Sequence, residues 1–394
     1  MKGCSAMEIR RLTERDYDEL LELLNSVFAN KYGRAMDFLS EQPKMWRRDD
    51  EHMSRHTAVF EDGRMASVVG VYPLPTVIAG EELLFATTGN VATRPEYEGR
   101  GYFTRLFTDA MDELSTMGAD SARLGGSRVR YSRFGYEMSG SSINFEFTDE
   151  ARKRYFSESF GITFRKIDDG DTSALKFVDA LIKKKPFHVK RRADELSAAL
   201  HTKHSTPYLA LRDGEPIGYL SATADGQFVG HAEYGNRIVE TGYSDTKSLA
   251  DMICAWQSKL GRTVTFSLAP HEKEAVRLFC DASFDFTLVS PSHFKIINYE
   301  KIAGALMRLK DSYEPMERGE GVIEIEDYGR IILYKNTSGA GCERTSLPAD
   351  VTLDRAKATR LLFGPLSPIT VSDVPTSLKE FLPLPLSWNT LDYV

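Results

Sequence analysis

The feature that most constrains this chain is a glycine loop between a strand-like segment and an amphipathic one. The loop is Gly99-Arg100-Gly101, and it closely follows the strand-like Val91-Ala92-Thr93. Glycines at a helix start leave backbone N–H groups open to approach, and the helix dipole adds positive partial charge there. The pattern predicts a phosphate-binding loop, with a ligand-free strand-to-helix turn as the alternative. Apolar residues at spacings of three and four predict the helix itself: Phe103, Leu106, Phe107, Ala110 and Leu114.

Another segment downstream strengthens the ligand-binding interpretation. It reads Tyr131-Ser132-Arg133-Phe134-Gly135-Tyr136. Together with Pro95-Glu96-Tyr97-Glu98-Gly99-Arg100-Gly101, it resembles the GNAT acyltransferase superfamily. The glycine stretch is similar to the acetyl-CoA pyrophosphate loop of that superfamily, and the tyrosine stretch is similar to its Tyr-x-x-Phe-Gly-Phe/Tyr segment. The chain departs from the pattern at Glu98, where Arg or Gln is usual, and at Phe103, where Gly or Ala is usual.

The resemblance implies acetyl-CoA as co-substrate, and it assigns the residues of a site. Tyr131 would be the general acid, because a phenol with a pKa of about 10 stays protonated at neutral pH and can protonate a thiolate. A lone tyrosine is more often a packing residue, and here the motif context favours catalysis. Phe134 and Tyr136 are expected to pack. The implied cofactor-binding residues are Val91, Ala92, Thr93, Glu98, Gly99, Arg100, Gly101, Tyr102 and Phe103.

Length and pattern divide the chain into three expected units, at residues 1–150, 151–290 and 291–394, since 394 residues exceed one ordinary core. A strand-turn-strand pattern followed by an amphipathic helix occurs in both of the first two units. The second unit lacks a Gly-x-Gly loop before its helix, which Asp245 is expected to cap. Residues 143–147 alternate in polarity, which predicts the strand that closes the first unit.

The third unit is similar to a sterol-carrier-like domain, with a helix at 299–310, two strands and a helix at 353–364. Behind two GNAT-like units, this order resembles the Eis-type acetyltransferases. The chain is therefore expected to be α+β, with two tandem GNAT-like mixed-sheet domains followed by a sterol-carrier-like α/β domain. The second GNAT-like domain would be degenerate. The resemblance also implies a homo-oligomer such as a hexamer.

The end of the chain carries a further expectation. In Eis-type enzymes the C-terminal carboxylate returns to the active site and helps deprotonate or orient the substrate amine, and here that group belongs to Val394. An α-carboxyl with a pKa of about 3.5 is a weak base, so hydrogen bonding or a water relay is favoured over direct abstraction. Packing alone also explains the apolar tail. Asp392 is a rival carboxylate.

Composition narrows the class of partner. The net charge of −7 disfavours nucleic acid and mildly favours small cationic molecules. No apolar run of about 18 residues predicts a membrane span. A basic cluster at 183–192 is expected on a solvated surface, with a cofactor phosphate or RNA as the alternative contact. Scattered cysteines predict reduced thiols, a cytoplasmic location and no metal site: Cys4, Cys254, Cys280 and Cys342.

The leading hypothesis is an acetyl-CoA-dependent N-acetyltransferase. Its acceptor would be a primary amine of a small cationic molecule, aminoglycoside- or polyamine-like, or an exposed lysine. Another acyl group or nucleophile is a variant of this hypothesis. The alternative is a catalytically inactive GNAT-fold protein, whose cofactor site Glu98 and Phe103 have abolished and whose C-terminal domain binds an apolar ligand. Candidate cleft residues, each more often ordinary core or surface, are Trp46, Asp49, Asp50 and Tyr72.

Overall fold

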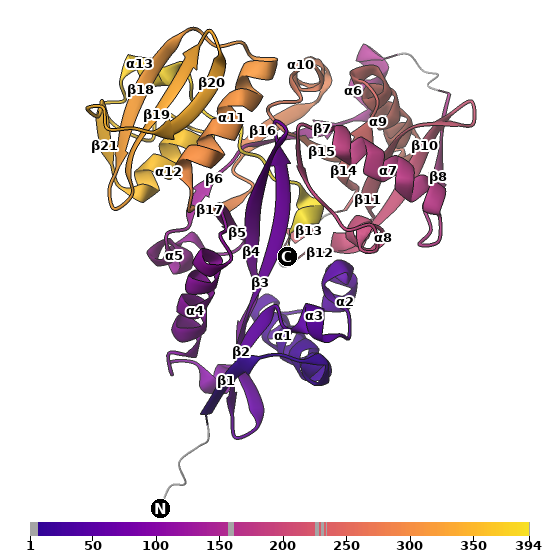
Figure 1. The fold of residues 1–394 in the computed structure, drawn as a ribbon. Coiled ribbons are helices and arrows are strands. Elements are labelled where there is room, and N and C mark those ends of the chain that lie inside the picture. Colours follow the sequence, from indigo (N-terminus) through magenta and orange to yellow (C-terminus); the bar gives the residue numbers. More distant parts are fainter. Residues whose placement is uncertain (1–6, 157–160, 225–227, 230–231, 234, 394) are drawn as a thin grey trace, which may run out of the picture.

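The chain folds around two large mixed sheets and one smaller sheet (Figure 1). This computed structural model describes residues 7–156, 161–224, 228–229, 232–233 and 235–393. The expected α+β class is confirmed. Within the described residues, no helix is long and apolar enough to cross a bilayer. Cys254, Cys280 and Cys342 are free thiols, and Cys4 lies outside the described residues.

The first sheet is built on the long hairpin at the centre of Figure 1. Only β4 and β5 run parallel within it. Its strand order is β1 (Met7–Arg11), β2 (His56–Glu61), β3 (Arg64–Ile78), β4 (Glu81–Thr93), β5 (Ser121–Leu124), β17 (Ser292–Ile296) and β6 (Glu137–Ser139), with β9 (Phe187–Val189) also on β3.

Two helices cover opposite faces of this sheet, because side chains alternate along its strands. Val71 packs toward α4 (Tyr102–Thr116), and Tyr72 packs toward α1 (Tyr17–Tyr32). Four residues of the predicted stripe of α4 are buried, namely Leu106, Phe107, Ala110 and Leu114, and Phe103 is partly buried. Shorter helical elements complete this part: η1 (Glu14–Asp16), α2 (Phe38–Glu41), η2 (Pro43–Met45), α3 (Asp50–Met53), η3 (Pro95–Tyr97), α5 (Arg128–Tyr131) and η4 (Ser132–Phe134).

The second sheet repeats the plan of the first, again with one parallel pair, β14 and β15. Its order is β8 (Ile162–Lys166), β10 (Ser205–Arg212), β11 (Glu215–Thr223), β14 (Arg237–Tyr243), β15 (Val264–Leu268), β7 (Ser142–Phe147) and β16 (Asp285–Val289). Asp245 caps α9 as predicted, accepting a 2.7 Å bond from the Ser248 N–H. The remaining elements are α6 (Asp149–Tyr155), α7 (Thr172–Lys184), α8 (Leu196–Leu200), η5 (Thr202–His204), β12 (Phe228–Val229), β13 (Ala232–Glu233), α9 (Thr246–Leu260) and α10 (Lys273–Ala282).

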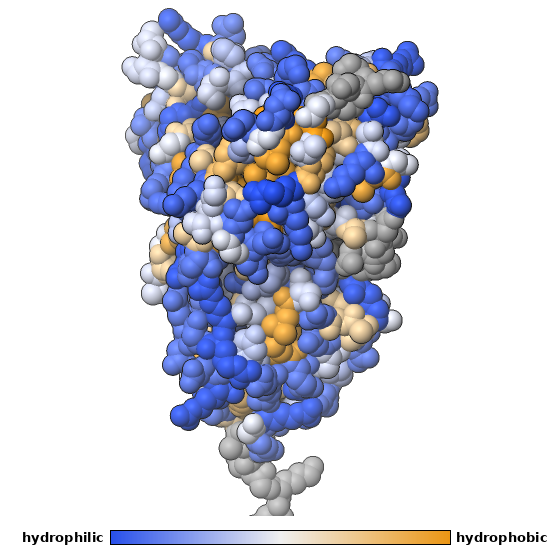
Figure 2. All heavy atoms as spheres, turned by 90° about the vertical axis from the view of Figure 1, so that its right-hand side faces the viewer, coloured by the Kyte–Doolittle hydropathy of each residue, from blue (hydrophilic) through white to orange (hydrophobic). Residues whose placement is uncertain are grey.

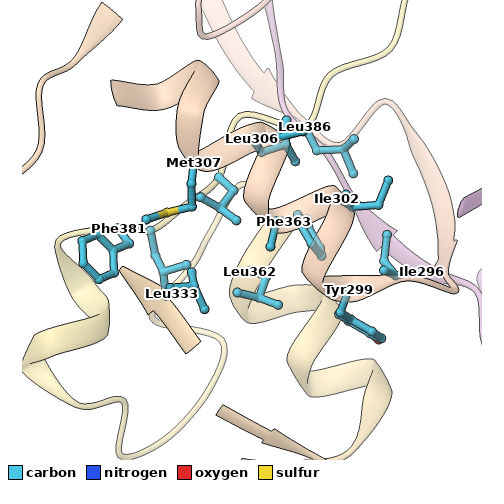
Figure 3. Close-up of a cluster of buried hydrophobic side chains, with 14 of the residues drawn as sticks. Ile296, Tyr299, Ile302, Leu306, Met307, Leu333, Leu362, Phe363, Phe381 and Leu386 are labelled. Atoms are coloured by element: carbon cyan, nitrogen blue, oxygen red, sulfur yellow. The ribbon is translucent and has the colours of Figure 1, made fainter. Parts of the chain in front are cut away.

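The third part packs helices on a four-stranded sheet, and Figure 3 shows how side chains from both fill the space between them. Leu306 and Met307 come from α11 (Tyr299–Tyr313), while Leu362 and Phe363 come from α12 (Arg355–Phe363). The sheet order is β20 (Gly339–Arg344), β19 (Gly329–Asn336), β18 (Gly319–Ile325) and β21 (Val351–Leu353), and α13 (Thr376–Lys379) and η6 (Thr390–Asp392) follow.

The chain then returns from this third part to the centre of the molecule, as the yellow segment of Figure 1. Trp388 anchors the segment among aromatic rings of the first sheet, with centroids 5.4 Å from Phe85 and 5.9 Å from Phe294. The face in Figure 2 is mainly hydrophilic, with hydrophobic residues gathered in its upper half and a smaller group below the middle.

The two large sheets exchange one strand each. The sequence predicted that residues 143–147 would close the first sheet, and this prediction is wrong. These residues lie in β7, which pairs with β15 and β16 of the second sheet. The vacant place in the first sheet is taken by β17, which pairs with β5 and β6. Alternating polarity predicted the strand correctly, but it does not determine which sheet the strand joins.

The two crossing points of this exchange touch each other at Gly140, between β6 and β7. Its φ is +79°, and a Cβ there would lie 3.2 Å from both Pro291 Cγ and the Leu386 carbonyl oxygen. The Gly140 N–H donates to Phe363 O at 2.7 Å. Glycine is therefore required here for its conformation and for its lack of a side chain.

We expect Gly140→Ala to lower the free energy of unfolding by about 2 to 3 kcal/mol, because conformational strain adds to a contact with backbone. Thermal and urea unfolding would measure it. The matched control is Gly261→Ala, which has φ +64° but nothing within 4 Å of a Cβ, and it should cost only about 1 kcal/mol. Equal losses in the two variants would contradict the close contact.

Candidate active site

The parallel strands β4 and β5 separate part-way along their length. Their pairing runs from Phe85 opposite Ser121 to Thr87 opposite Arg123. Beyond that point β4 continues to Thr93 with β3 as its only strand partner among the described residues. Successive peptide groups point to opposite edges of a strand, and the Arg94 N–H donates to Ala66 O on β3. Among the predicted residues, Val91 and Thr93 therefore present their peptide groups on the open edge of β4, and Ala92, opposite Val68, faces β3.

The predicted glycine loop lies between β4 and α4. Gly99 has φ +76° and Gly101 has φ +82°, and a Cβ on either would meet nothing within 4 Å. No side chain caps the N-terminus of α4. No described residue accepts a hydrogen bond from the N–H groups of 99–101. The loop thus presents open donors at the positive end of a helix, as an anionic group requires.

The side chains of the loop turn away from those donors. Arg100 pairs with Glu61 at the end of β2, and the Tyr102 hydroxyl donates to Glu61 Oε2 at 2.6 Å. Any ligand contact of Arg100 and Tyr102 would therefore use their backbone. Glu98 is exposed beside the loop, so its carboxylate stands near the place where phosphate would bind.

Phe103 connects this loop to Tyr131. Phe103 lies in the first turn of α4, and the centroid of its ring is 6.1 Å from that of Tyr131 and 5.4 Å from that of Phe107. Tyr131 is 6% exposed, and burial raises the pKa of its hydroxyl. The phenol therefore stays protonated at neutral pH, as a proton donor must. Phe134 packs on Phe107, with their rings 4.5 Å apart.

Tyr136 is also fully packed, but it has a polar partner on β4. Its hydroxyl lies 2.9 Å from Thr88 Oγ1, just past the point where β4 and β5 separate. Its burial is the packing role expected from the sequence.

Sequence reasoning missed Asn90, which sits in β4 with φ +52°. Asn90 Nδ2 donates to the Tyr72 hydroxyl at 2.6 Å, and that hydroxyl contacts His56 Nε2 at the same distance. Asn90 Oδ1 is buried without a hydrogen-bond partner. A Gly-Asn pair inside a strand was the available signal, because asparagine tolerates left-handed backbone.

The other candidate cleft residues have structural partners. Trp46 Nε1 donates to Phe38 O at 2.6 Å, and Asp49 accepts from the His52 N–H at 2.8 Å. Asp50 accepts from the Glu14 N–H at 2.8 Å.

The basic cluster at 183–192 does not lie wholly on a solvated surface, because Arg191 is buried. Its guanidinium binds both oxygens of Glu240 and, through Nε at 2.9 Å, Asp392. Asp392, the rival carboxylate, is thus held in an ion pair. The neighbouring Tyr393 donates to Pro291 O at 2.7 Å, under the guanidinium of Arg123. Val394, the other predicted catalytic residue, lies outside the described residues.

A cavity of about 300 Å³ lies elsewhere, where β14 and β15 separate in the second sheet. Residues 239–241 and 267–269 line it, together with the tail from Ser387 to Tyr393. It is the counterpart of the first opening, without a glycine loop. No group of histidines, cysteines or carboxylates in the described part of the chain could hold a metal ion.

Comparison with known sequences identifies the first part of the chain. Residues 8–139 match the family described as acetyltransferase (GNAT) domain. The chain carries a GNAT acetyltransferase domain. Its match includes β4, the glycine loop, α4 and Tyr131. No curated protein matches the chain.

Solved structures extend the likeness to the whole chain at the level of fold. A GCN5-related N-acetyltransferase from Anabaena variabilis has a TM-score of 0.67 at 15% identity, covering 99% of this chain and all of that one. Eis1 from Mycobacterium abscessus has a TM-score of 0.64 at 16% identity, covering 97% of this chain and 98% of that one. A GCN5-related N-acetyltransferase from Kribbella flavida also has a TM-score of 0.64 at 16% identity, covering 99% of both chains. The fold expected from the Eis-type resemblance is confirmed.

We expect Glu98→Gln to tighten acetyl-CoA binding to the GNAT domain about two- to fivefold at low salt, because a carboxylate at the positive end of a helix repels phosphate. The gain should shrink at high salt. Calorimetry at two ionic strengths would measure it. The control Glu113→Gln, roughly 18 Å away along α4 and paired with Arg11, should change nothing. Equal effects of both variants would contradict a local charge effect.

Proposed function

We propose that this chain transfers the acetyl group of acetyl-CoA to a primary amine. The observation that carries the proposal is one opening at the start of α4, where a free strand edge, an uncapped glycine loop and a buried tyrosine meet. These groups fit the thioester substrate: open N–H donors for its pyrophosphate and the edge of β4 for its amide-containing arm. Acetyl-CoA supplies the activated acetyl group, and the chain supplies the positioning and the proton.

The chemistry asks three things of the chain's own residues. Residues 99–101 anchor the phosphates. Peptide N–H groups of Val91 and Thr93 orient the thioester carbonyl, toward which the neutral amine attacks. As the new C–N bond forms and the C–S bond breaks, Tyr131 Oη gives its proton to the departing sulfur. The attacking nitrogen loses one proton to water, and Tyr131 regains its proton from water.

The alternative function, an inactive protein that holds an apolar ligand, has less support. Side chains of α11, α12 and the strands fill the core of the third part (Figure 3). The glycine loop keeps open space at both glycines despite Glu98 and Phe103. Failure to bind acetyl-CoA would favour the alternative.

The acceptor is to be found by measuring thiol release from acetyl-CoA across a panel of amines. Aminoglycosides, polyamines and lysine peptides, which the family resemblance suggests, belong in the panel together with amino acids. A homo-oligomer and a cytoplasmic location stay predictions from the sequence.

We expect Tyr131→Phe to lower kcat at least about a hundredfold, the usual effect of losing a general acid. The affinity for acetyl-CoA should be nearly unchanged, because the phenyl ring still packs on Phe103. Steady-state kinetics and calorimetry would separate the two effects. The control Phe134→Leu, in the same aromatic group, should retain most of the turnover. Near-normal kcat in Tyr131→Phe would refute the assignment.

We also expect residues appended after Val394 to impair catalysis more than folding, since the proposed role of the terminal carboxylate needs a free chain end. The extended and natural chains would be compared in kcat and in thermal unfolding. An Asp392→Asn variant of the natural chain is the companion, because it loosens the Arg191 pair and leaves the end of the chain intact. Full activity of the extended chain would exclude the terminal carboxylate.

A further inference from the structure

Three cations lie beside the point where β4 and β5 separate: Arg123 and Lys203 are buried, and Lys44 is partly buried. Arg123 lies opposite Thr87, at the last rung of their pairing. Lys44, in η2, and Lys203, in η5, are close enough to Arg123 for its charge to lower the pKa of each lysine. These three residues come from both halves of the chain. We call them the cationic cluster.

Arg123 is not ion-paired with any carboxylate of the described residues. It is 2% exposed, its Nε donates to Ser292 Oγ at 2.9 Å, and its guanidinium stacks 3.8 Å from the centre of the Tyr393 ring. Its Nη1 has no hydrogen-bond partner, and no described carboxylate forms an ion pair with it. A buried guanidinium without a partner is costly, because arginine cannot readily lose its proton.

The two lysines are also poorly matched. Lys44 donates to the Leu391 carbonyl oxygen, which carries no full charge. Lys203 is 8% exposed at its side chain and lies 3.9 Å from Glu41 Oε1, too far for a hydrogen bond. Burial lowers the pKa of Lys44 to about 7 and that of Lys203 to about 8.

The charges of the neighbourhood do not balance. Its cations are Arg123, Lys44, Lys203, Arg191 and Lys185, and the carboxylates that face them are Asp392, Glu240 and Glu41. With all of these groups ionised, five positive charges face three negative ones among the described residues. An anion bound here would reduce this excess and raise the pKa values of Lys44 and Lys203.

Lys203 lies in strained backbone. Lys203 has φ +63° and His204 has φ +56°, two successive non-glycine residues in left-handed backbone. Thr202 Oγ1, just before them, is buried without a partner. Asn90, on the β4 side, combines a positive φ with an orphaned oxygen. Strain and unpaired polar atoms are typical of sites that bind a ligand.

We propose that the amine acceptor also carries a carboxylate, as an amino acid or a short peptide does, and that Arg123, Lys44 and Lys203 bind it. The inference rests on the proposed transferase function. It places the carboxylate at the apex of the opening between β4 and β5. The polyamine-like acceptors suggested by net charge would be repelled by this cluster. The chain's own terminal carboxylate is the other source of such an anion, and the test has to distinguish the two.

The first experiment compares L-amino acids with their amides as acceptors, at equal concentrations of neutral amine. We expect kcat/KM to be at least about tenfold higher for the acids, the size of one charge-assisted hydrogen bond. The preference should fall as the pH rises above 7, where Lys44 loses its proton in the field of Asp392, Arg191, Lys203 and Arg123. Acids and amides used equally well would overturn the proposal while leaving the transferase intact.

The second experiment removes one positive charge. We expect Lys203→Met to raise KM for the acids about tenfold or more, so that the preference for acids over amides shrinks by the same factor. The matched control is Lys183→Met, an exposed lysine paired with Asp179 on α7, which should leave both unchanged. An acid preference that survives in both Lys203→Met and Lys44→Met variants of normal thermal stability would overturn the assignment of these residues.

The third experiment measures binding without turnover. An N-acetyl amino acid and its amide are titrated into the natural chain and into the chain extended beyond Val394. Acid-selective binding that is lost in Lys203→Met supports the cationic cluster, even if no amine is acetylated and the proposed transfer fails. Acid binding that appears only in the extended chain would mean that the chain's own carboxylate occupies the cluster, which overturns the proposal.

Discussion

The exchange of β7 and β17 is the constraint on which the rest of this structure depends. It joins the two large sheets by backbone pairing, so the halves share hydrogen-bonded ladders as well as a packed surface. The site depends on it as well. Strand β5 is fixed on one side by β17, a strand from far along the chain, while β4 stays with β3. Just past its last pair with β5, β4 has a register shift against β3 at Asn90 and Val91. The Ser292 hydroxyl on β17 accepts from Arg123 Nε at the point where β4 and β5 separate.

A second constraint is electrostatic and fixes the end of the chain. Arg191 lies just after β9 and binds Glu240 of the second sheet and Asp392 of the tail in one buried group. Buried ion pairs of this kind add little net stability, because desolvation offsets their attraction. Their effect is geometric: the tail has one place to lie, between the opening in the first sheet and the cavity of the second. Because Arg191 is paired with two carboxylates, its burial costs little free energy. The burial of Arg123, which forms no ion pair with a described carboxylate, costs more.

Local order was predictable from the sequence, and long-range order was not. Periodicity and caps predicted α4, the strand-turn-strand units and the Asp245 cap, because these depend on neighbouring residues. The alternation at 143–147 predicted a strand but not its partners, since any sheet with one buried face accepts it. Arg191 was expected in solvent because charge runs usually are solvated, and its partners lie 49 and 201 residues away. The glycine loop was predicted from its glycines and the helix that follows, and the role of Tyr131 from motif resemblance; Phe103 contacts the Tyr131 ring. Lys203 carried no signal, because its burial comes from an irregular turn in the other half.

The exchanged strands also bear on how such a chain could have arisen. Two copies of one domain that swap an identical element form a closed, symmetric pair. Each large sheet here has the same strand order, and each takes its sixth strand from the other half, as such a pair would if a gene duplication had fused its members head to tail. Once fused, only one copy needed to keep its glycine loop. The cavity beside β14 and β15 would then correspond to the opening beside β4 and β5, and the tail now lines it. Ancestry of this kind would leave neither half able to fold as a complete unit when cut from the other.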